Sequence, residues 1–163
     1  MIDANGNEMG KAKVLFFLEE SNRIEGISEP VTDEEFACAS DFLAAREVTL
    51  PKIQLYVDAV AQARIRDRTG MDVRVGGHYP PPGGKHIRDE LRKLVDRANA
   101  DDSPYDVHQA YETLHPFMDG NGRSGRILWL WMMQKQEKPL GLHLGFLHTW
   151  YYQSLEFGAG RGR

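Results

Sequence analysis

The sequence has little cysteine: Cys38 is the only one among 163 residues. A lone thiol cannot form an internal disulfide, so the chain is not a disulfide-stabilised scaffold, and we expect it to work in a reducing cytoplasm. No apolar run is long enough to span a membrane, and the N-terminus lacks the charged-then-apolar order of a signal peptide. We therefore expect a protein without a membrane partner.

An excess of positive charge is also missing, since 20 basic and 24 acidic side chains give a formal net charge of −4. This balance does not provide the excess of basic side chains that nucleic-acid-binding proteins use to bind the phosphate backbone. A chain of this length with 41% hydrophobic residues can form one domain with a proper core but is short for two. We predict a loose N-terminus over residues 1–10, a single domain over 11–157 and a flexible tail over 158–163.

The densest group of functional side chains lies in twelve consecutive residues, 115–126, with the sequence HPFMDGNGRSGR. They comprise an imidazole, a carboxylate, an amide, two guanidinium groups and three glycines. Glycine in this number destabilises a regular element, so a loop is expected. The following residues, 127–133, are apolar on all sides, which is typical of a buried helix. The loop therefore opens a central helix.

This junction of loop and helix suits phosphate. The first free backbone N–H groups of the helix would lie at Gly120, Asn121 and Gly122, where they can bind phosphate oxygens. Arg123 and Arg126 are three residues apart, so both guanidinium groups lie on one helical face, and their geometry matches phosphate. Two cations beside a helix N-terminus favour a polyphosphate ligand.

Two further side chains complete a group-transfer site. Asp119 could hold a divalent metal that bridges the phosphates, and His115 could accept a proton from an incoming nucleophile. His115 precedes Pro116, which disfavours helical geometry at the histidine and presents its ring in the loop. Together these groups favour phosphoryl or nucleotidyl transfer.

Other interpretations of the same stretch fit less well. Gly120, Gly122 and Gly125 satisfy the dinucleotide-binding pattern, but the preceding residues look helical and not strand-like. A calcium loop would need ligands where Arg123 and Leu130 stand. A purely structural turn between helices would need one glycine and no pair of arginines on one face.

Residues 115–126 resemble the signature H-P-F-x-[DE]-G-N-G-R-x-x-R of the Fic (Fic/Doc) family at every defined position. The resemblance implies an all-α Fic-type core and transfer of AMP from ATP to a Ser, Thr or Tyr hydroxyl of a target protein. It also implies His115 as general base and Asp119 as Mg²⁺ ligand. The implied phosphate- and nucleotide-binding residues are Gly120, Asn121, Gly122, Arg123 and Arg126.

A second stretch, SNRIEG over residues 21–26, ends a helix that the pattern predicts over 11–23. It resembles S/T-x-x-x-E-G/N, the motif on the inhibitory helix of Fic proteins, which would here span about 11–26 and include Ser21. The resemblance implies that Glu25 pairs with Arg126 and blocks ATP in cis, by removing one phosphate clamp and adding negative charge. The alternative is an ordinary amphipathic helix end with Glu25 facing solvent.

A third stretch, residues 69–84, alternates like a short strand, contains a glycine pair and ends in prolines that exclude helix. We predict a short β-hairpin. It resembles the Fic flap, which aligns the target protein beside the active site by strand-type backbone pairing. The alternative is that Pro80–Pro82 form only a rigid connector. The residues assigned to the target-docking flap are Val73, Arg74, Val75, Gly76 and Gly77.

Caps and apolar periodicity predict the remaining helices. They are expected after a Thr32–Glu35 capping box to about 45, after Pro51 to about 66, and over 85–99, 104–114, about 121–137 and 146–155. The charged residues 64–68 are interpreted as a solvated helix end. The histidines outside the loop are interpreted as structural or ordinary helix residues, namely His108, His143 and His148.

The leading hypothesis is a Mg²⁺-dependent protein adenylyltransferase with ATP as substrate, inhibited in cis by Glu25. One alternative is removal of AMP from a modified protein, with Glu25 activating water. Phosphate transfer, as in the Doc branch, is disfavoured because that branch departs from the glycines found here at 120 and 122. A catalytically silent helical module that binds a partner on the flap is a further alternative. The sequence leaves open whether the chain forms a homodimer.

Overall fold

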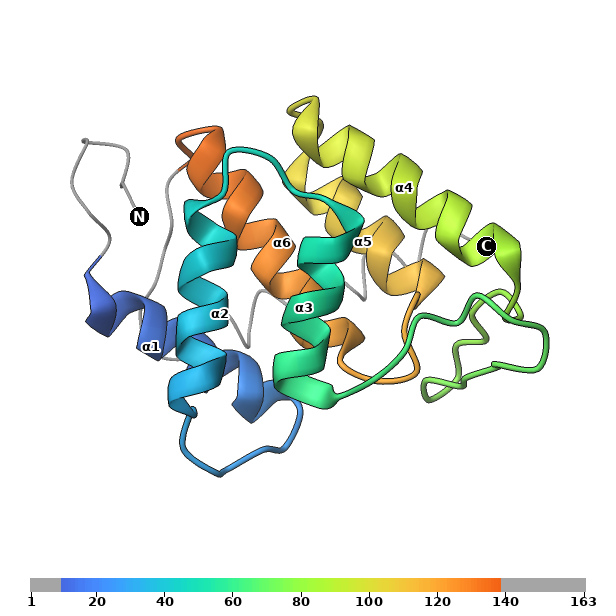
Figure 1. The fold of residues 1–163 in the computed structure, drawn as a ribbon, viewed down its shortest axis with the longest axis horizontal. Coiled ribbons are helices and arrows are strands. Elements are labelled where there is room, and N and C mark those ends of the chain that lie inside the picture. Colours follow the sequence, from blue (N-terminus) through green and yellow to red (C-terminus); the bar gives the residue numbers. More distant parts are fainter. Residues whose placement is uncertain (1–9, 139–163) are drawn as a thin grey trace.

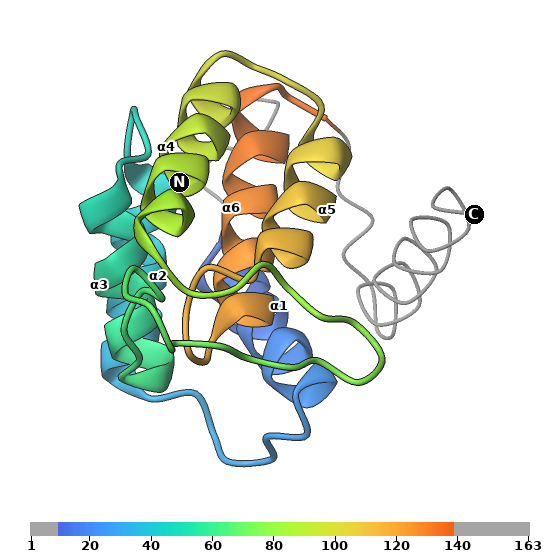
Figure 2. The same cartoon turned by 90° about the vertical axis from the view of Figure 1, so that its right-hand side faces the viewer.

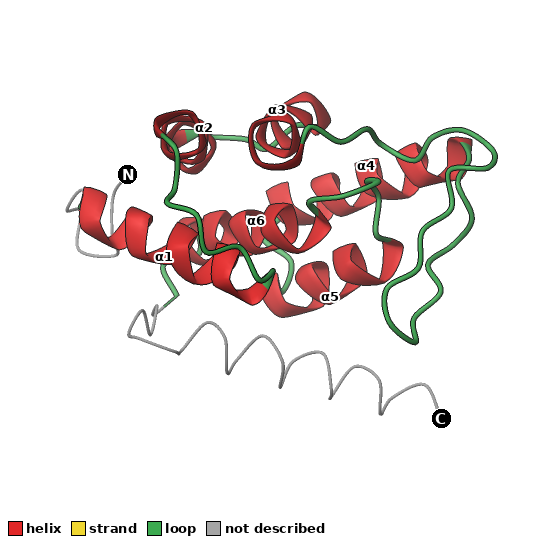
Figure 3. Cartoon of the chain, turned by 90° about the horizontal axis from the view of Figure 1, so that it is seen from below, coloured by secondary structure: helices red, strands yellow, loops and turns green. Residues whose placement is uncertain are grey.

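The structure, a computed structural model, describes residues 10–138. Within this range it is all-helical, with no named strand, which confirms the all-α prediction (Figures 1 and 3). No helix in the described range is long and apolar enough to cross a membrane. The helices are α1 (Lys11–Ile24), α2 (Asp33–Ala44), α3 (Leu50–Ala61), α4 (Lys85–Asn99), α5 (Pro104–Leu114) and α6 (Asn121–Lys135).

Helix α6 forms the centre of the fold and packs against each of the other five helices. Figure 3 shows α2 and α3 on one side of it and α1 and α5 on the other, and Figure 2 shows α1 near its N-terminal turn. Ile127 to Met133 of α6 are all buried, as expected for a helix that is apolar on all sides. The central helix therefore fixes the position of the loop that precedes it.

Capping interactions start the helices where the sequence predicts them. The Thr32 hydroxyl accepts from the Glu35 N–H at 3.1 Å, and the Glu35 carboxylate accepts from the Thr32 N–H at 3.3 Å, which confirms the capping box. Ser103 caps α5, with Pro104 in its first turn. These caps therefore fix the residues at which α2 and α5 begin.

The prediction of a helix to residue 66 with a solvated charged end is wrong. Helix α3 ends at Ala61, because Gln62 takes a left-handed conformation with φ 50°. Residues 64–66 then run beside residues 116–118, joined by backbone hydrogen bonds of 2.8 and 2.9 Å. As a result Arg66 is fully buried.

The segment between residues 66 and 85 is a long loop (Figure 2). One antiparallel bridge joins Val75 and His78 across the glycine pair, with backbone hydrogen bonds of 3.1 and 2.9 Å. The structure thus has the predicted turn but not the strands of a β-hairpin. Pro80–Pro82 lack N–H groups and cannot extend the ladder on that side. The helix predicted over 146–155, which contains His148, lies outside the described residues, as does His143.

Candidate active site

His115 lies at the C-terminal end of α5 in a left-handed conformation, with φ 50°. Its N–H donates to the Tyr111 carbonyl at 2.9 Å, and its Nδ1 lies 3.3 Å from the Glu112 carbonyl. A carbonyl oxygen can only accept, so this contact favours a proton on Nδ1 and a lone pair on Nε2. Burial lowers the pKa of His115, against a smaller rise from the Glu112 carbonyl, and this favours the neutral imidazole.

Asn121 fixes the loop that follows His115. Its side-chain amide accepts from the Phe117 N–H and donates to the Phe117 carbonyl, both at 2.8 Å. Asn121 and Phe117 are both buried. The amide of Asn121 therefore holds the loop, and its contribution to an anion site would come from its backbone N–H.

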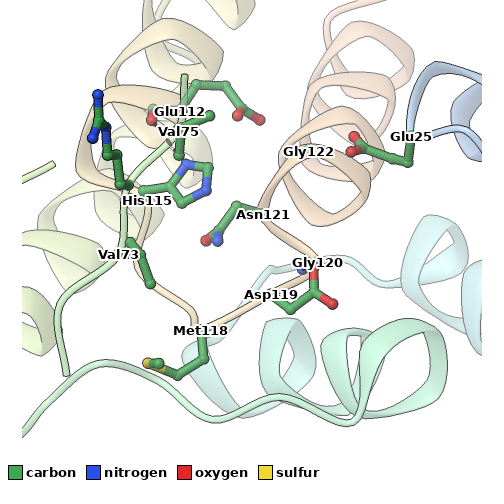
Figure 4. Close-up of a pocket in the computed structure, with 11 residues that line it drawn as sticks. Glu25, Val73, Val75, Glu112, His115, Met118, Asp119, Gly120, Asn121 and Gly122 are labelled. Atoms are coloured by element: carbon green, nitrogen blue, oxygen red, sulfur yellow. Dashed lines mark hydrogen bonds between the residues drawn. The ribbon is translucent and has the colours of Figure 1, made fainter. Parts of the chain in front are cut away.

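The loop, the start of α6 and the flap enclose a cavity of about 380 Å³. Figure 4 shows the His115 ring, the Asn121 side chain and the Asp119 carboxylate around it. Two of the lining residues were not assigned to the site from the sequence, Glu112 and Met118. The described residues that line the cavity are Glu25, Val73, Arg74, Val75, Glu112, His115, Met118, Asp119, Gly120, Asn121 and Gly122.

The N-terminus of α6 opens on this cavity without a side-chain cap. Gly120 is the N-cap residue, with φ 78°, and a Cβ there would lie 2.8 Å from the Ala61 Cβ, so only glycine fits. The first N–H groups of a helix have no partner within the helix and favour anions. This end of α6 therefore fits the phosphate site expected from the sequence.

Asp119, the metal ligand expected from the sequence, lies next to the start of α6. Its Oδ1 accepts from the Gly120 N–H at 2.7 Å, and the carboxylate lies at the cavity wall. The described residues contain no cluster of three or more His, Cys, Asp or Glu that could form a protein cage for a metal. Mg²⁺ is usually held by one or two carboxylates together with substrate phosphates, so a single Asp119 fits it.

Arg126 is held by α1 through three acceptors. Its Nε donates to the Ser21 hydroxyl at 2.8 Å, and its Nη2 donates to the Ser21 carbonyl at 3.0 Å and to Glu25 Oε1 at 2.6 Å. Arg126 is fully buried, whereas the Glu25 side chain is 36% exposed. The structure thus brings together Ser21, Glu25 and Arg126 from positions about a hundred residues apart.

Glu25 also contacts the first turn of α6. Figure 4 shows it beside Gly122, on the other side of that turn from His115. A Cβ at position 122 would overlap Glu25 Oε1, so the carboxylate occupies the space left by the missing side chain. Glu25 therefore lies in the cavity next to the helix end that is expected to bind phosphate.

Arg123 and Arg126 are not among the described residues that line the cavity. Arg123 is buried and its Nη1 donates to the Val60 carbonyl at 2.5 Å. Both guanidinium groups therefore donate to protein oxygens in this structure. The sequence places them on one helical face but does not show these partners.

The flap and α5 supply the remaining wall. Val73, Arg74 and Val75 line the cavity, whereas Gly76 and Gly77 form the turn beyond it. Glu112, which sequence analysis missed, is buried and stands one helical turn before His115. The i, i+3 spacing of these two residues could have indicated a shared face.

In a comparison with known families, residues 43–133 match the Fic/DOC family. This range spans more than half of the chain. It contains the flap, the loop from His115 and almost all of α6, and it does not include α1.

Proposed function

The chain belongs to the Fic/DOC family, and on this basis we propose that it is a Mg²⁺-dependent protein adenylyltransferase that uses ATP. The observation that carries this proposal is a single cavity lined by a neutral imidazole, a carboxylate and an uncapped helix N-terminus. His115, Asp119 and Gly120 contribute these three groups. Membership of the family favours AMP transfer or a related activity.

In this proposal His115 acts as the general base. Its Nε2 accepts the proton of a Ser, Thr or Tyr hydroxyl as that oxygen attacks the α-phosphorus of ATP. One O–P bond forms, the bond from the α-phosphorus to the bridging oxygen breaks, and pyrophosphate leaves. Asp119 would hold Mg²⁺, which neutralises phosphate charge when bound, and the N-terminus of α6 stabilises the charge that develops on the phosphate oxygens.

We also propose that Glu25 inhibits this activity in cis. Its ion pair of 2.6 Å occupies Arg126, one of the two cations expected to clamp phosphate. Its carboxylate also lies against Gly122, where it adds negative charge at the anion site. Both effects would disfavour ATP in a productive position.

The proposed partner is a target protein docked on the flap. Val73, Arg74 and Val75 line the same cavity as His115, so a segment lying along them would have a side chain within reach of the imidazole. Backbone pairing of this kind accepts many sequences and still presents one side chain at a fixed place.

Intact-mass analysis after incubation with Mg²⁺ and ATP tests the proposed function. The Glu25→Gly protein should label itself or a lysate protein with AMP, and His115→Ala in the same background should abolish the label. Label from the α-phosphate but not from the γ-phosphate distinguishes AMP transfer from phosphate transfer. Absence of label in both the wild type and Glu25→Gly would contradict the proposal.

Removal of AMP from a modified protein is a second candidate, favoured by the place of Glu25. Its carboxylate lines the cavity and is partly exposed, so it could activate a water molecule. In that case Glu25→Ala should lower hydrolysis of an AMP-modified protein, and increased hydrolysis would exclude this role. A protein without catalysis, which only binds a partner, would be indicated if Mg²⁺ and ATP fail to bind after Glu25 is replaced.

A further inference from the structure

Arg66 makes an unusual set of contacts for a residue outside the motif. Its Nε donates to the His115 carbonyl at 2.6 Å and its Nη2 to the Leu114 carbonyl at 2.9 Å. Its Nη1 donates to the carbonyls of Met71 and Pro81 at 3.1 and 2.9 Å. One guanidinium group therefore joins the end of α5 to both ends of the flap.

The backbone of Arg66 strengthens the same connection. Its N–H donates to the Pro116 carbonyl at 2.8 Å, and its carbonyl accepts from the Gly84 N–H at 2.9 Å. The flap base is closed by a bond of 2.8 Å from the Gly83 N–H to Asp72 Oδ1. The flap and the loop at His115 thus meet at one residue.

Arginine is the side chain suited to this place. Its planar group offers five N–H donors in a fixed geometry, so it can bind carbonyls that point from different directions. Arg66 is fully buried, and loss of its donors would remove the partners of four backbone carbonyls, including that of the buried Leu114. A lysine keeps the charge but has one small head group, which cannot reach two segments in the same way.

We propose that Arg66 is a positioning residue that holds the flap and His115 in one rigid frame, so that a target hydroxyl on the flap meets the imidazole. The inference rests on the proposed function for the role of His115 and of the flap. Arg66 does not line the cavity and acts only through the backbone of the two segments that do. Its loss should change the geometry of transfer and leave nucleotide binding intact.

The test compares Arg66→Lys with Arg97→Lys, both in the Glu25→Gly background. Arg97 is the control, because it forms an ion pair of 2.6 Å with Asp102 at the end of α4 and, within residues 10–138, makes no hydrogen bond or ion pair to the flap or to residues 114–118. Each variant is measured in two ways. Kinetics give the kcat of AMP transfer to a protein and the KM for ATP, and mass spectrometry or NMR follows amide hydrogen exchange along the chain.

Arg66→Lys should lower kcat about 10- to 100-fold, as expected for a small misplacement of reacting groups, and leave the KM for ATP within about twofold. Exchange should rise together in residues 71–84 and 114–118 and stay unchanged in α2. Arg97→Lys should change none of these. An unchanged kcat, or an exchange increase in one segment only or in all helices alike, would overturn the inference.

A second variant covers the case in which Arg66→Lys does not fold. Asp72→Ala removes the bond to Gly83 and loosens only the flap base, so it should lower kcat and raise exchange at 71–84 but not at 114–118. Unchanged transfer by this variant would overturn the coupling of flap and His115. If Glu25→Gly alone transfers no AMP, the proposed function fails, and the exchange arms still decide whether Arg66 joins the two segments.

Discussion

Replacement of Glu25 by glycine gives the sharpest test of the contact between α1 and α6. The substitution removes the ion pair of 2.6 Å to the buried Arg126 and leaves both hydrogen bonds from Arg126 to Ser21. Hydrogen bonds to charged groups contribute about 1.5–3 kcal/mol. Because the Glu25 side chain is 36% exposed, we take the lower end, about 1.5 kcal/mol.

This free energy sets the expected effect on activity. A free-energy difference of about 1.4 kcal/mol corresponds to a tenfold ratio of populations. The ion pair between Glu25 and Arg126 would therefore be broken in fewer than about one molecule in ten. If the proposed inhibition holds, Glu25→Gly makes all molecules competent. The kcat/KM of AMP transfer should then rise about tenfold over the wild type.

The assay follows AMP transfer to a lysate protein at ATP concentrations below KM, with Glu29→Gly as the control. Glu29 is an exposed glutamate in the loop after α1, so its replacement removes the same charge from the same region. The control should retain the rate of the wild type. A kcat/KM for Glu25→Gly within twofold of the wild type, or below it, would refute the inhibitory role of the ion pair.

Three other predictions follow from the site and its surroundings. Burial lowers the pKa of His115 below its usual 6.5, and the neutral imidazole is the form that accepts a proton. As the pH is lowered, kcat/KM should therefore stay high until the pH is below 6.5. A pH–rate profile with half-maximal activity above pH 6.5 would contradict this. Asp119→Asn keeps an acceptor for the Gly120 N–H but removes the negative charge. The apparent affinity for Mg²⁺ in transfer assays should therefore fall on the order of tenfold, while the circular dichroism spectrum stays unchanged. An unchanged dependence of transfer on Mg²⁺ would exclude Asp119 as a ligand. Burial lowers the pKa of His108 to about 4, so between pH 6.5 and 4 the unfolded state binds more protons than the folded state. The free energy of unfolding should therefore decrease as the pH falls, by up to about 1.4 kcal/mol per pH unit, and urea unfolding at pH 7 and 5 should show this loss. A His108→Gln variant with the same pH dependence would show that another group is responsible.

Local signals in the sequence predicted much of the helical framework. The Thr32–Glu35 capping box, the bounds of α4 and the proline that starts α5 need only neighbouring residues, and all three are confirmed. The association of Glu25 with Arg126 came from a family motif, because no local pattern places residues 101 positions apart in contact. The structure shows the contact, and its effect on activity stays a prediction.

The errors arose where distant segments decide the conformation. Nothing in the local sequence marks Gln62 as left-handed, and without that turn the charged residues after it looked like a solvated helix end. Arg66 is buried because carbonyls from two other segments meet there, which no periodicity can reveal. Glu112 was missed for a similar reason, since it becomes part of the cavity only when α5 packs against α6.

The attachment of α1 limits how the protein could ever be switched. Val14, Phe17 and Leu18 of α1 are buried in the same core as α6. Detaching α1 from the core would expose all three side chains to water, at a cost of about 1.5–3 kcal/mol for each. The sum is comparable to the total free energy of unfolding of many domains. Glu25, in contrast, follows the last residue of α1 and is partly exposed, so a rotation about its own side-chain bonds breaks its ion pair with Arg126 at far lower cost. If Glu25 inhibits the enzyme as proposed, an activator need only bind one carboxylate at the surface, and the helix before it can remain a permanent part of the core.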